Sequence, residues 1–212
     1  AAGLPEGVIN LVQGEVETGI ALAQHQQVDG ILFTGSETVG KILHSQLGGE
    51  PGKVLALEMG GNNPLIVSNV NDLEAACYHI IQSAFITSGQ RCTCARRLIL
   101  PDGDDKADAL LIKLVQMTKD LRVGLWNDAK EPYMGPVVSG SVASHYLSAV
   151  DDLVERGAEP CLMPMQLRGV DALVTPAIID VTNVEDIEDE EVFAPLLQVY
   201  RVKDFDAAIA TA

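Results

Sequence analysis

The chain has 212 residues, of which 47% are hydrophobic and 21% are charged, and its formal net charge is −16. Its length allows one ordinary domain or one domain and part of a second, and its apolar content excludes a disordered chain. No apolar run reaches the roughly 18 residues of a membrane helix, and the negative charge repels a phosphate backbone, so we expect no membrane and no nucleic-acid partner.

The first part of the chain has the periodicity of a β-α-β unit. We expect a turn and a short strand at residues 4–12, a helix at 17–27, a buried strand at 30–34, a helix at 37–47 and a strand at 54–57. Backbone N–H groups after the turn at Gly35 and Ser36 could bind a pyrophosphate, but Ser36 is also an ordinary helix N-cap, so both interpretations stay open. Glu37 suits the helix dipole and would not help a phosphate.

The remaining residues continue to alternate strands and helices, which predicts parallel α/β sheets. The expected strands are 64–68, which is buried, 98–100, 173–179, which Pro176 interrupts, and 196–202. The expected helices are 72–86, 104–121, 139–156 and one that begins at Asp204. Residues 124–136 are an irregular connection, and the acidic residues 185–191 are by default a solvated segment.

Cys92 lies between helix 72–86 and strand 98–100, and connections carry chemistry more often than element interiors do. Gly89 lets the backbone turn tightly just before it. Three arginines lie nearby, namely Arg91, Arg96 and Arg97. Their charge would favour the thiolate of a nucleophilic cysteine. A small buried cysteine has the same local composition, so this alternative stays open.

Other chemistry has little support in the sequence. Cys92 and Cys94 are too closely spaced for a zinc ligand pair and no second pair follows, so we expect no metal. The four histidines are scattered over expected helices without the pattern of a ligand or catalytic set. The four cysteines do not form a disulfide scaffold, which indicates a reducing compartment and predicts a cytoplasmic location.

Four stretches resemble segments of the aldehyde dehydrogenase family, in the family's order. Gly89-Gln90-Arg91-Cys92 is similar to its Gly-Gln-x-Cys signature, and Glu58-Met59-Gly60-Gly61-Asn62-Asn63-Pro64 to its Glu-Leu-Gly-Gly-Lys segment. Phe33-Thr34-Gly35-Ser36-Glu37-Thr38-Val39-Gly40 is similar to its cofactor-binding turn, and Glu190-Glu191-Val192-Phe193-Ala194-Pro195 to its Glu-Glu-x-Phe-Gly-Pro segment. Asn62 replaces the family's common Lys and Ala194 its usual Gly, which leaves the backbone at residue 194 in question.

The resemblance implies a Rossmann-like, parallel-sheet α/β fold. It places the C-terminal part of an NAD-binding domain in residues 1–58 and most of a catalytic domain, truncated at its C-terminal end, in residues 59–212. It also implies that the chain is an internal stretch, somewhat under half of the usual family chain, of a homo-oligomeric protein. The implied cofactor is NAD, and the implied partner is a small-molecule semialdehyde.

The resemblance also implies roles for single residues. Cys92 would be the nucleophile that forms a thioester, and Glu58 the general base for its hydrolysis, with a pKa raised by burial. The cofactor-binding residues would be Gly35, Ser36, Glu37, Thr38, Val39, Gly40, Glu191 and Phe193. Arg91 is the first candidate for binding a dianionic substrate, followed by Arg96 and Arg97, although all three could instead pair with acidic neighbours or support the thiolate.

Three functions stay open at this point. The first is an NAD-dependent, hydrolysing aldehyde dehydrogenase that acts on a semialdehyde. The second is a CoA-acylating relative, which would not need Glu58 as a base. The third is a noncatalytic fold fragment or binding scaffold, which an assay of NADH production by the full-length protein would separate from the other two.

Overall fold

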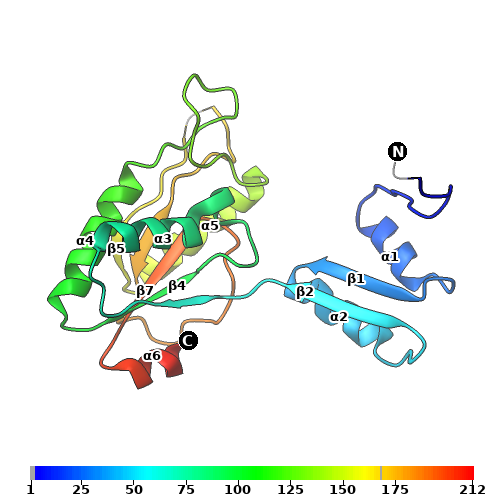
Figure 1. The fold of residues 1–212 in the computed structure, drawn as a ribbon, viewed down its shortest axis with the longest axis horizontal. Helices are drawn as coiled ribbons and strands as arrows, with labels where there is room; N and C mark the ends of the chain where they lie inside the picture. Colours follow the sequence, from blue (N-terminus) through cyan, green and yellow to red (C-terminus); the bar gives the residue numbers. More distant parts are fainter. Residues whose placement is uncertain (1–2, 168) are drawn as a thin grey trace. The chain divides into compact units, whose positions relative to one another are not determined.

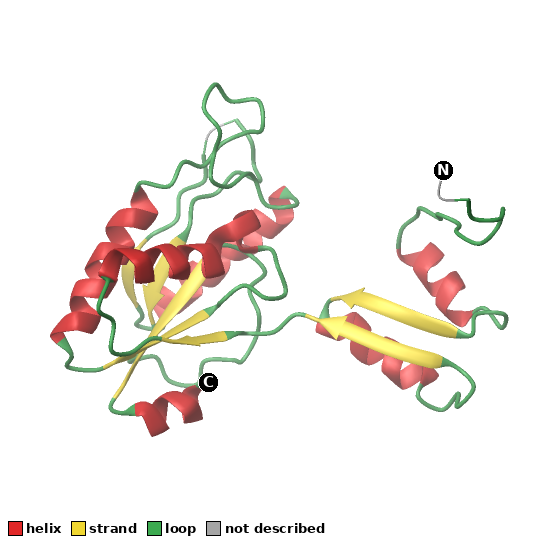
Figure 2. Ribbon diagram, viewed as in Figure 1, coloured by secondary structure: helices red, strands yellow, loops and turns green. Residues whose placement is uncertain are grey.

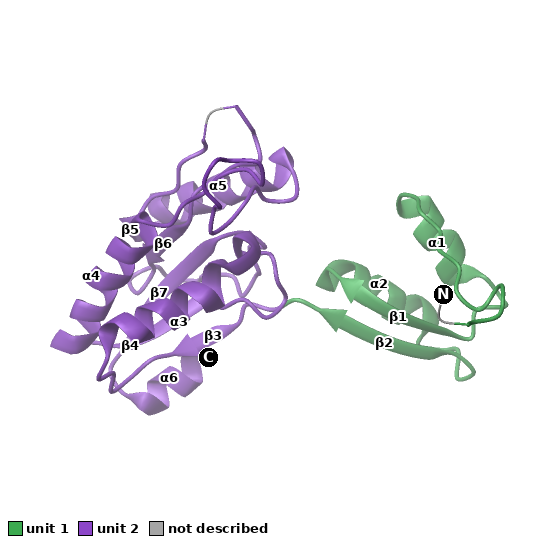
Figure 3. Cartoon of the chain, turned by 45° about the horizontal axis from the view of Figure 1, so that its top comes forward, with its two compact units in different colours: residues 1–60 green, residues 61–212 purple. Residues whose placement is uncertain are grey.

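The computed structural model describes residues 3–167 and 169–212. The chain divides into two compact units, Ala1–Gly60 (unit 1) and Gly61–Ala212 (unit 2) (Figure 3). The boundary expected after residue 58 lies close to this division, and the cofactor-binding and catalytic roles of the two units stay predictions. No helix in the described ranges is long and apolar enough to cross a membrane.

Unit 1 contains a parallel strand pair connected by a helix. Its elements are α1 (Val16–Gln24), β1 (Gly30–Gly35), α2 (Glu37–Leu47) and β2 (Val54–Met59) (Figure 1). The two strands pair in register from Gly30 opposite Val54 to Gly35 opposite Met59, and α2 packs on both. The strand, helix and strand expected at 30–34, 37–47 and 54–57 are found, and α2 has the bounds expected from the sequence, whereas the β-α-β unit expected to begin at residues 4–12 lacks its first strand.

Three expectations for unit 1 are wrong. Residues 4–12 form a turn and irregular structure instead of a strand, with Gly7 at a φ of 84° and no described partner strand. The helix expected to reach residue 27 ends at Gln24. β1 is not buried, because its residues on one side face α2 while those on the other side are exposed. Leu32, on the uncovered side, is 83% exposed. A strand with one covered face buries only alternate residues.

Unit 2 is built on a five-stranded sheet in the order β3-β4-β7-β6-β5 (Figure 2). The strands are β3 (Pro64–Ile66), β4 (Arg97–Pro101), β5 (Glu159–Leu162), β6 (Ala177–Asp180) and β7 (Leu196–Val202). Neighbours run parallel except β5, which pairs antiparallel with β6 at the edge. The predicted parallel α/β class is confirmed, with one antiparallel edge strand.

Helices cover both faces of the sheet in unit 2. They are α3 (Leu73–Phe85), α4 (Asp105–Lys119), α5 (Gly140–Glu155) and α6 (Phe205–Thr211) (Figure 1). Leu197 of β7 packs with residues of α3 and α4, whereas its neighbour Leu196 packs with residues of α5. Because successive side chains of a strand point to opposite faces, α3 and α4 cover one face and α5 the other. Burial on both faces explains the continuous apolar run Leu98–Leu100 of β4.

Proline determines where two of the strands lie. β6 begins at Ala177, after Pro176, so the expected strand 173–179 is too long at its start, where Val174 forms an isolated bridge with Gln166. β5, which the sequence did not reveal, contains Pro160 and shifts its register there. A proline cannot donate to a ladder, so it is confined to edges, strand starts and bulges.

The buried hydroxyl of Tyr146 on α5 provides a test of this packing. It lies 2.9 Å from the Thr175 carbonyl oxygen and 3.3 Å from that of Pro195, just before β6 and β7. We expect Tyr146→Phe to lower the free energy of unfolding by about 1–3 kcal/mol, because buried carbonyl groups lose their donor. Urea unfolding measures the loss, with Tyr78→Phe at an exposed position of α3 as the control. Equal losses in the two variants would contradict the assignment.

Candidate active site

Cys92 lies in a strained connection between α3 and β4, which we call the Cys92 loop (residues 86–96). It begins with a 3₁₀ turn (Ile86–Gly89) directly after α3. Thr87, Ser88 and Gly89 have φ values of 54°, 59° and 68°, all in the left-handed region. Glycine adopts this region readily, whereas threonine and serine do so at a cost, so surrounding contacts must hold the turn in place.

Side-chain hydrogen bonds supply part of this restraint. Ser88 is buried, and its Oγ donates to the Gly135 carbonyl oxygen at 2.8 Å. Thr87 Oγ1 accepts from Arg91 Nε at 2.8 Å. The two residues with unfavourable φ values are therefore each fixed by their own hydroxyl group, one to the irregular connection 124–136 and one within the loop.

Gly89 and Gln90 join the Cys92 loop to two distant segments. A Cβ atom on Gly89 would lie 2.5 Å from the Ala194 carbonyl oxygen, so a larger residue does not fit. Gln90 Nε2 donates to the Phe193 carbonyl oxygen at 3.1 Å, and its Oε1 accepts from the Val138 N–H at 2.9 Å. The glycine and the glutamine before the cysteine thus have a structural role, because they dock the loop against both segments.

Asn63, in the stretch before β3, fixes the backbone at Cys92 and just after it. Its Nδ2 donates to the carbonyl oxygens of Cys92 at 2.7 Å and Cys94 at 3.0 Å. Its own carbonyl oxygen accepts from the N–H groups of Arg96 at 2.9 Å and Arg97 at 3.1 Å. This role of Asn63 was not predicted, because an asparagine before a proline gives no local sign of a partner so far along the chain.

The environments of the four cysteines single out Cys92. It is exposed, whereas Cys94 is buried, so the alternative of a small buried cysteine is wrong for Cys92 and applies to Cys94. Burial raises the pKa of Cys77 to about 11 and also raises the pKa of Cys161. These two thiols are therefore poor sources of thiolate at neutral pH.

The three arginines near the thiol have different partners. Arg96 is 2% exposed and pairs with Glu191 at 2.9 Å, so the alternative of an acidic partner holds for it. Arg97 Nη1 donates to the Thr211 carbonyl oxygen at 2.8 Å. Arg91 is exposed, and its recorded side-chain bond is the one from Nε to Thr87 Oγ1. Arg91 is therefore the arginine of the loop that presents its charge to solvent.

The acidic residues 185–191 are mostly exposed, as expected, but two arginines anchor them. Arg156 pairs with Glu188 at 2.9 Å, and this hydrogen bond lowers the pKa of Glu188. Arg96 holds Glu191, whose side chain is 19% exposed. The Phe193 ring lies with its centroid 5.4 Å from Arg96 Cζ, a cation–π contact. The predicted cofactor residues Glu191 and Phe193 are therefore brought together beside the Cys92 loop.

The two departures from the family pattern fit their surroundings. Asn62 Nδ2 donates to Asp189 Oδ1 at 3.1 Å, which attaches the acidic segment to the stretch before β3. Ala194 is buried, its N–H donates to the Val192 carbonyl oxygen at 2.8 Å, and its φ lies outside the left-handed region. Alanine therefore adopts the local backbone without strain.

In unit 1, the predicted cofactor residues 35–40 form the turn after β1 and the start of α2. Ser36 is the N-cap of α2, and its Oγ accepts from the Val39 N–H at 3.4 Å. Glu37 pairs with Lys41 at 2.7 Å, which offsets its negative charge at the helix N-terminus. A helix N-terminus that follows a parallel strand fits the diphosphate of a dinucleotide, so these residues are compatible with such a cofactor.

The end of β2 places its last two side chains on opposite faces. Met59 faces α2, and a Cβ atom on Gly40 would collide with its thioether, so Gly40 serves close packing of helix on strand. Glu58 points to the exposed face of the strand pair. The burial that we expected for Glu58 is therefore not found within unit 1, because α2 covers only the other face.

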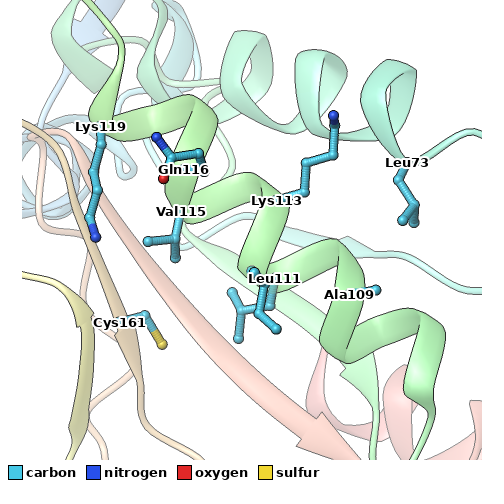
Figure 4. A pocket seen from close by; sticks show the side chains of 9 residues that line it. Leu73, Ala109, Leu111, Lys113, Val115, Gln116, Lys119 and Cys161 are labelled. Atoms are coloured by element: carbon cyan, nitrogen blue, oxygen red, sulfur yellow. The ribbon is translucent and has the colours of Figure 1, made fainter.

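A separate hollow of about 740 Å³ lies on unit 2, beside α4 (Figure 4). Most of its lining comes from α4, with Leu73 of α3 and Cys161 of β5 at its borders. It contains none of the residues that the sequence pointed to, and its wall is mainly apolar. We therefore place the candidate active site at the Cys92 loop.

The chain was compared with protein families and with curated proteins. The model described as "Aldehyde dehydrogenase family" matches residues 1–212. The chain is 54% identical over 211 residues to the N-succinylglutamate 5-semialdehyde dehydrogenase of Ectopseudomonas mendocina (strain ymp). This match covers 100% of the chain and 43% of the relative, so the chain spans less than half of the relative's length.

Solved structures show the same similarity. Methylmalonate-semialdehyde dehydrogenase (DddC) from Oceanimonas doudoroffii has a TM-score of 0.89 at 27% identity, over 98% of this chain and 43% of that one. Betaine aldehyde dehydrogenase (betB) from Staphylococcus aureus, in complex with NAD+, has a TM-score of 0.84 at 27% identity, over 98% and 42%. Glyceraldehyde-3-phosphate dehydrogenase GapN from Methanocaldococcus jannaschii, complexed with NADP, has a TM-score of 0.82 at 29% identity, over 96% of this chain and 43% of that one.

The two neighbouring asparagines allow a matched test of the loop. Asn63→Ala removes the donor to the carbonyl oxygens of Cys92 and Cys94, so we expect it to lower the free energy of unfolding by about 1–3 kcal/mol. It should also change the rate at which iodoacetamide alkylates Cys92, because the backbone around the thiol is released. Asn62→Ala, which loses one exposed bond to Asp189, is the control. Indistinguishable effects of the two substitutions would show that Asn63 does not hold the loop.

Proposed function

The chain belongs to the aldehyde dehydrogenase family, and on this premise we propose that the enzyme carrying it oxidises an aldehyde to a carboxylic acid through a thioester on Cys92. The chain covers 43% of its curated relative, so the activity of the whole enzyme is part of the proposal. The observation that carries it is the exposed thiol of Cys92 on a loop fixed by Asn63 and Gln90. A fixed, accessible thiol next to an exposed arginine suits nucleophilic attack.

The chemistry of the first stage follows from the thiolate. Cys92 Sγ attacks the aldehyde carbon, and the carbonyl oxygen becomes an alkoxide, to which the Cys92 N–H would donate as one group of an oxyanion hole. A bound nicotinamide cofactor supplies the acceptor for the hydride that the carbon then loses. The carbon is left as a thioester on Sγ, which the enzyme must still cleave.

We assign the cleavage step to Glu58 as general base. A water molecule gives a proton to the carboxylate and attacks the thioester, which releases the carboxylic acid and restores the thiol. The position of Glu58 as the second-last residue of β2, two residues before Gly60, and the family's motif support this role. A CoA-acylating enzyme would not need the carboxylate, so the presence of Glu58 favours hydrolysis.

We propose NAD as the cofactor, held by residues 35–40 and by Glu191 and Phe193. The start of α2 offers N–H groups to a diphosphate, and the Glu191 carboxylate can accept hydrogen bonds from ribose hydroxyl groups. One similar structure is complexed with NAD+ and another with NADP, so a nicotinamide cofactor is supported more strongly than the choice between the two.

We propose N-succinyl-L-glutamate 5-semialdehyde as the substrate and N-succinyl-L-glutamate as the product, a step of arginine catabolism. The 54% identity to an N-succinylglutamate 5-semialdehyde dehydrogenase supports this choice. Arg91 is a candidate partner for a substrate carboxylate, because it is the arginine of the Cys92 loop that is exposed. A cytoplasmic, homo-oligomeric enzyme stays a prediction, which the four free thiols support for the location.

The first test replaces the two cysteines of the loop separately in the full-length enzyme. Cys92→Ser should abolish NADH production from the semialdehyde, since a serine hydroxyl has no comparable ionised population at neutral pH, and Cys94→Ser should keep most of it. Initial rates with NAD and NADP and a panel of semialdehydes measure both variants and the wild type. Near-normal turnover in Cys92→Ser would overturn the assignment of Cys92 as the nucleophile. An inactive wild type would leave only the alternative of a noncatalytic fold fragment or binding scaffold.

The second test separates hydrolysis from the first stage. Glu58→Gln should still form the thioester and release one equivalent of NADH quickly, while steady turnover falls by roughly 10²- to 10⁴-fold. Rapid-mixing absorbance records the burst, and mass spectrometry of the quenched enzyme detects the adduct on Cys92. Glu17→Gln, an exposed carboxylate on α1 of unit 1 outside the proposed cofactor site, is a control for loss of charge. Normal steady turnover in Glu58→Gln would show that another group activates the water.

A further inference from the structure

Arg96 is a buried cation at the junction of two segments that carry proposed functions. Its Nη1 donates to the carbonyl oxygens of Gly89 at 2.5 Å and Ala194 at 3.2 Å. Its Nη2 donates to the Arg91 carbonyl oxygen at 3.1 Å and to Glu191 Oε1 at 2.9 Å. Its Nε also donates to Glu191 Oε1, at 3.2 Å. A guanidinium has five N–H groups, and these bonds use all of them.

The five bonds divide between the Cys92 loop and the segment before β7. The carbonyl groups of Gly89 and Arg91 lie immediately upstream of the thiol, whereas Glu191 and Ala194 lie in the distant segment. Because the guanidinium is planar and its donors have fixed directions, the two segments cannot shift independently while these bonds persist. One side chain therefore sets the position of one segment against the other.

The bonds to Glu191 also fix the direction of its carboxylate. Both end on Oε1, so the contact with Arg96 does not use Oε2. The side chain of Glu191 is 19% exposed and that of Arg96 is 3% exposed, so the pair has its cation inside and part of its carboxylate at the surface. The centroid of the Phe193 ring lies 5.4 Å from the guanidinium carbon Cζ. The carboxylate is thus held with one oxygen paired and the other available to a ligand hydroxyl.

We propose that Arg96 is a positioning residue that holds Glu191 for the cofactor and keeps it in register with the Cys92 loop. This inference rests on the proposed function, because Glu191 binds the cofactor there. The guanidinium of Arg96 bonds to Glu191 and to carbonyl groups. Arg96 therefore serves neither as a substrate anchor nor as a free charge beside the thiol. Arg91 is left with the substrate role.

The competing explanation is that Arg96 and Glu191 form a purely structural ion pair, and this explanation predicts different results. A buried pair often adds little to stability, and breaking it destabilises the protein wherever it lies. Unit 2 offers a matched example in Arg201, which is 14% exposed in its side chain and pairs with Asp108 at 2.6 Å and Asp180 at 3.6 Å. The recorded partners of Arg201 do not include the Cys92 loop, so Arg201→Met controls for the loss of a buried arginine.

The experiment uses the full-length enzyme with Arg96→Met, Glu191→Gln, the double variant and Arg201→Met. NADH titration followed by fluorescence gives the cofactor Kd, and iodoacetamide alkylation gives the reactivity of Cys92. Losing a bond to a charged group should raise the Kd roughly 10- to 100-fold in Arg96→Met and in Glu191→Gln. The Kd of the double variant should be no higher than that of the single variant with the higher Kd, because both substitutions remove the same Arg96–Glu191 contact.

The alkylation rate separates the two halves of the proposal. Arg96→Met should change it by at least about threefold, since two carbonyl bonds beside the thiol are lost, whereas Glu191→Gln and Arg201→Met should not. An unchanged Kd in Arg96→Met, multiplicative losses in the double variant, or an unchanged alkylation rate would each overturn the inference. If Arg96→Met does not fold, Arg96→Lys, which keeps the charge without the planar fork, carries the same expectations.

Failure of the inference is distinguishable from failure of the proposed function. A wild-type enzyme that binds NADH and oxidises the semialdehyde, together with an Arg96→Met variant that binds NADH equally well, would overturn the inference alone. A wild-type enzyme that binds neither NADH nor NADPH would overturn the cofactor assignment and the inference with it.

Discussion

The left-handed turn at Thr87, Ser88 and Gly89 is the constraint on which the candidate site depends. Two of these residues have side chains that disfavour the conformation, so the turn persists only because surrounding groups restrain it. Those restraints come from segments far apart in the chain, including Gly135, which accepts the Ser88 hydroxyl, and Ala194, against which Gly89 packs. The folded sheet must therefore be complete before Cys92 takes its place, which makes the geometry of the thiol a property of unit 2 as a whole.

The elements that the sequence predicts well are those whose signals are local. Ser36 caps α2, and helical periodicity continues to Leu47, so the bounds of α2 follow from neighbouring residues alone. β7 likewise has the bounds expected from its mainly apolar sequence, although Gln198 and Arg201 interrupt the apolar residues. The edge strand β5 was missed because Pro160 argues against a strand unless its position at the edge is known. The exposure of β1 was wrong for a related reason, since burial depends on which helices cover a sheet and local composition does not contain that information.

The residues of the candidate site also differ in whether their roles follow from local sequence or from the tertiary fold. The order of helix, glycine and strand was enough to place Cys92 in a connection between α3 and β4, whereas its role as nucleophile stays a prediction. The partners of Asn63 and Arg96 could not be inferred, because each bonds to groups that only the tertiary fold brings near. For Arg96 the sequence left three roles open, namely a substrate anchor, a charge that supports the thiolate and a partner of an acidic residue, and the fold buries it and pairs it with Glu191. Charge and proximity in sequence are therefore weaker guides to an arginine's role than its burial and its hydrogen-bond partners.

The exposed face of the β1–β2 pair has a practical consequence. Leu32 and Val54 place apolar surface there, on a two-stranded ribbon whose outer edges are unpaired within unit 1. Surfaces of this kind attract other apolar surfaces and other strands, and they promote aggregation when a protein is concentrated. Unit 1 by itself would aggregate readily, so poor solubility of a short version of this protein would reflect this surface and would say nothing about the geometry of the Cys92 loop.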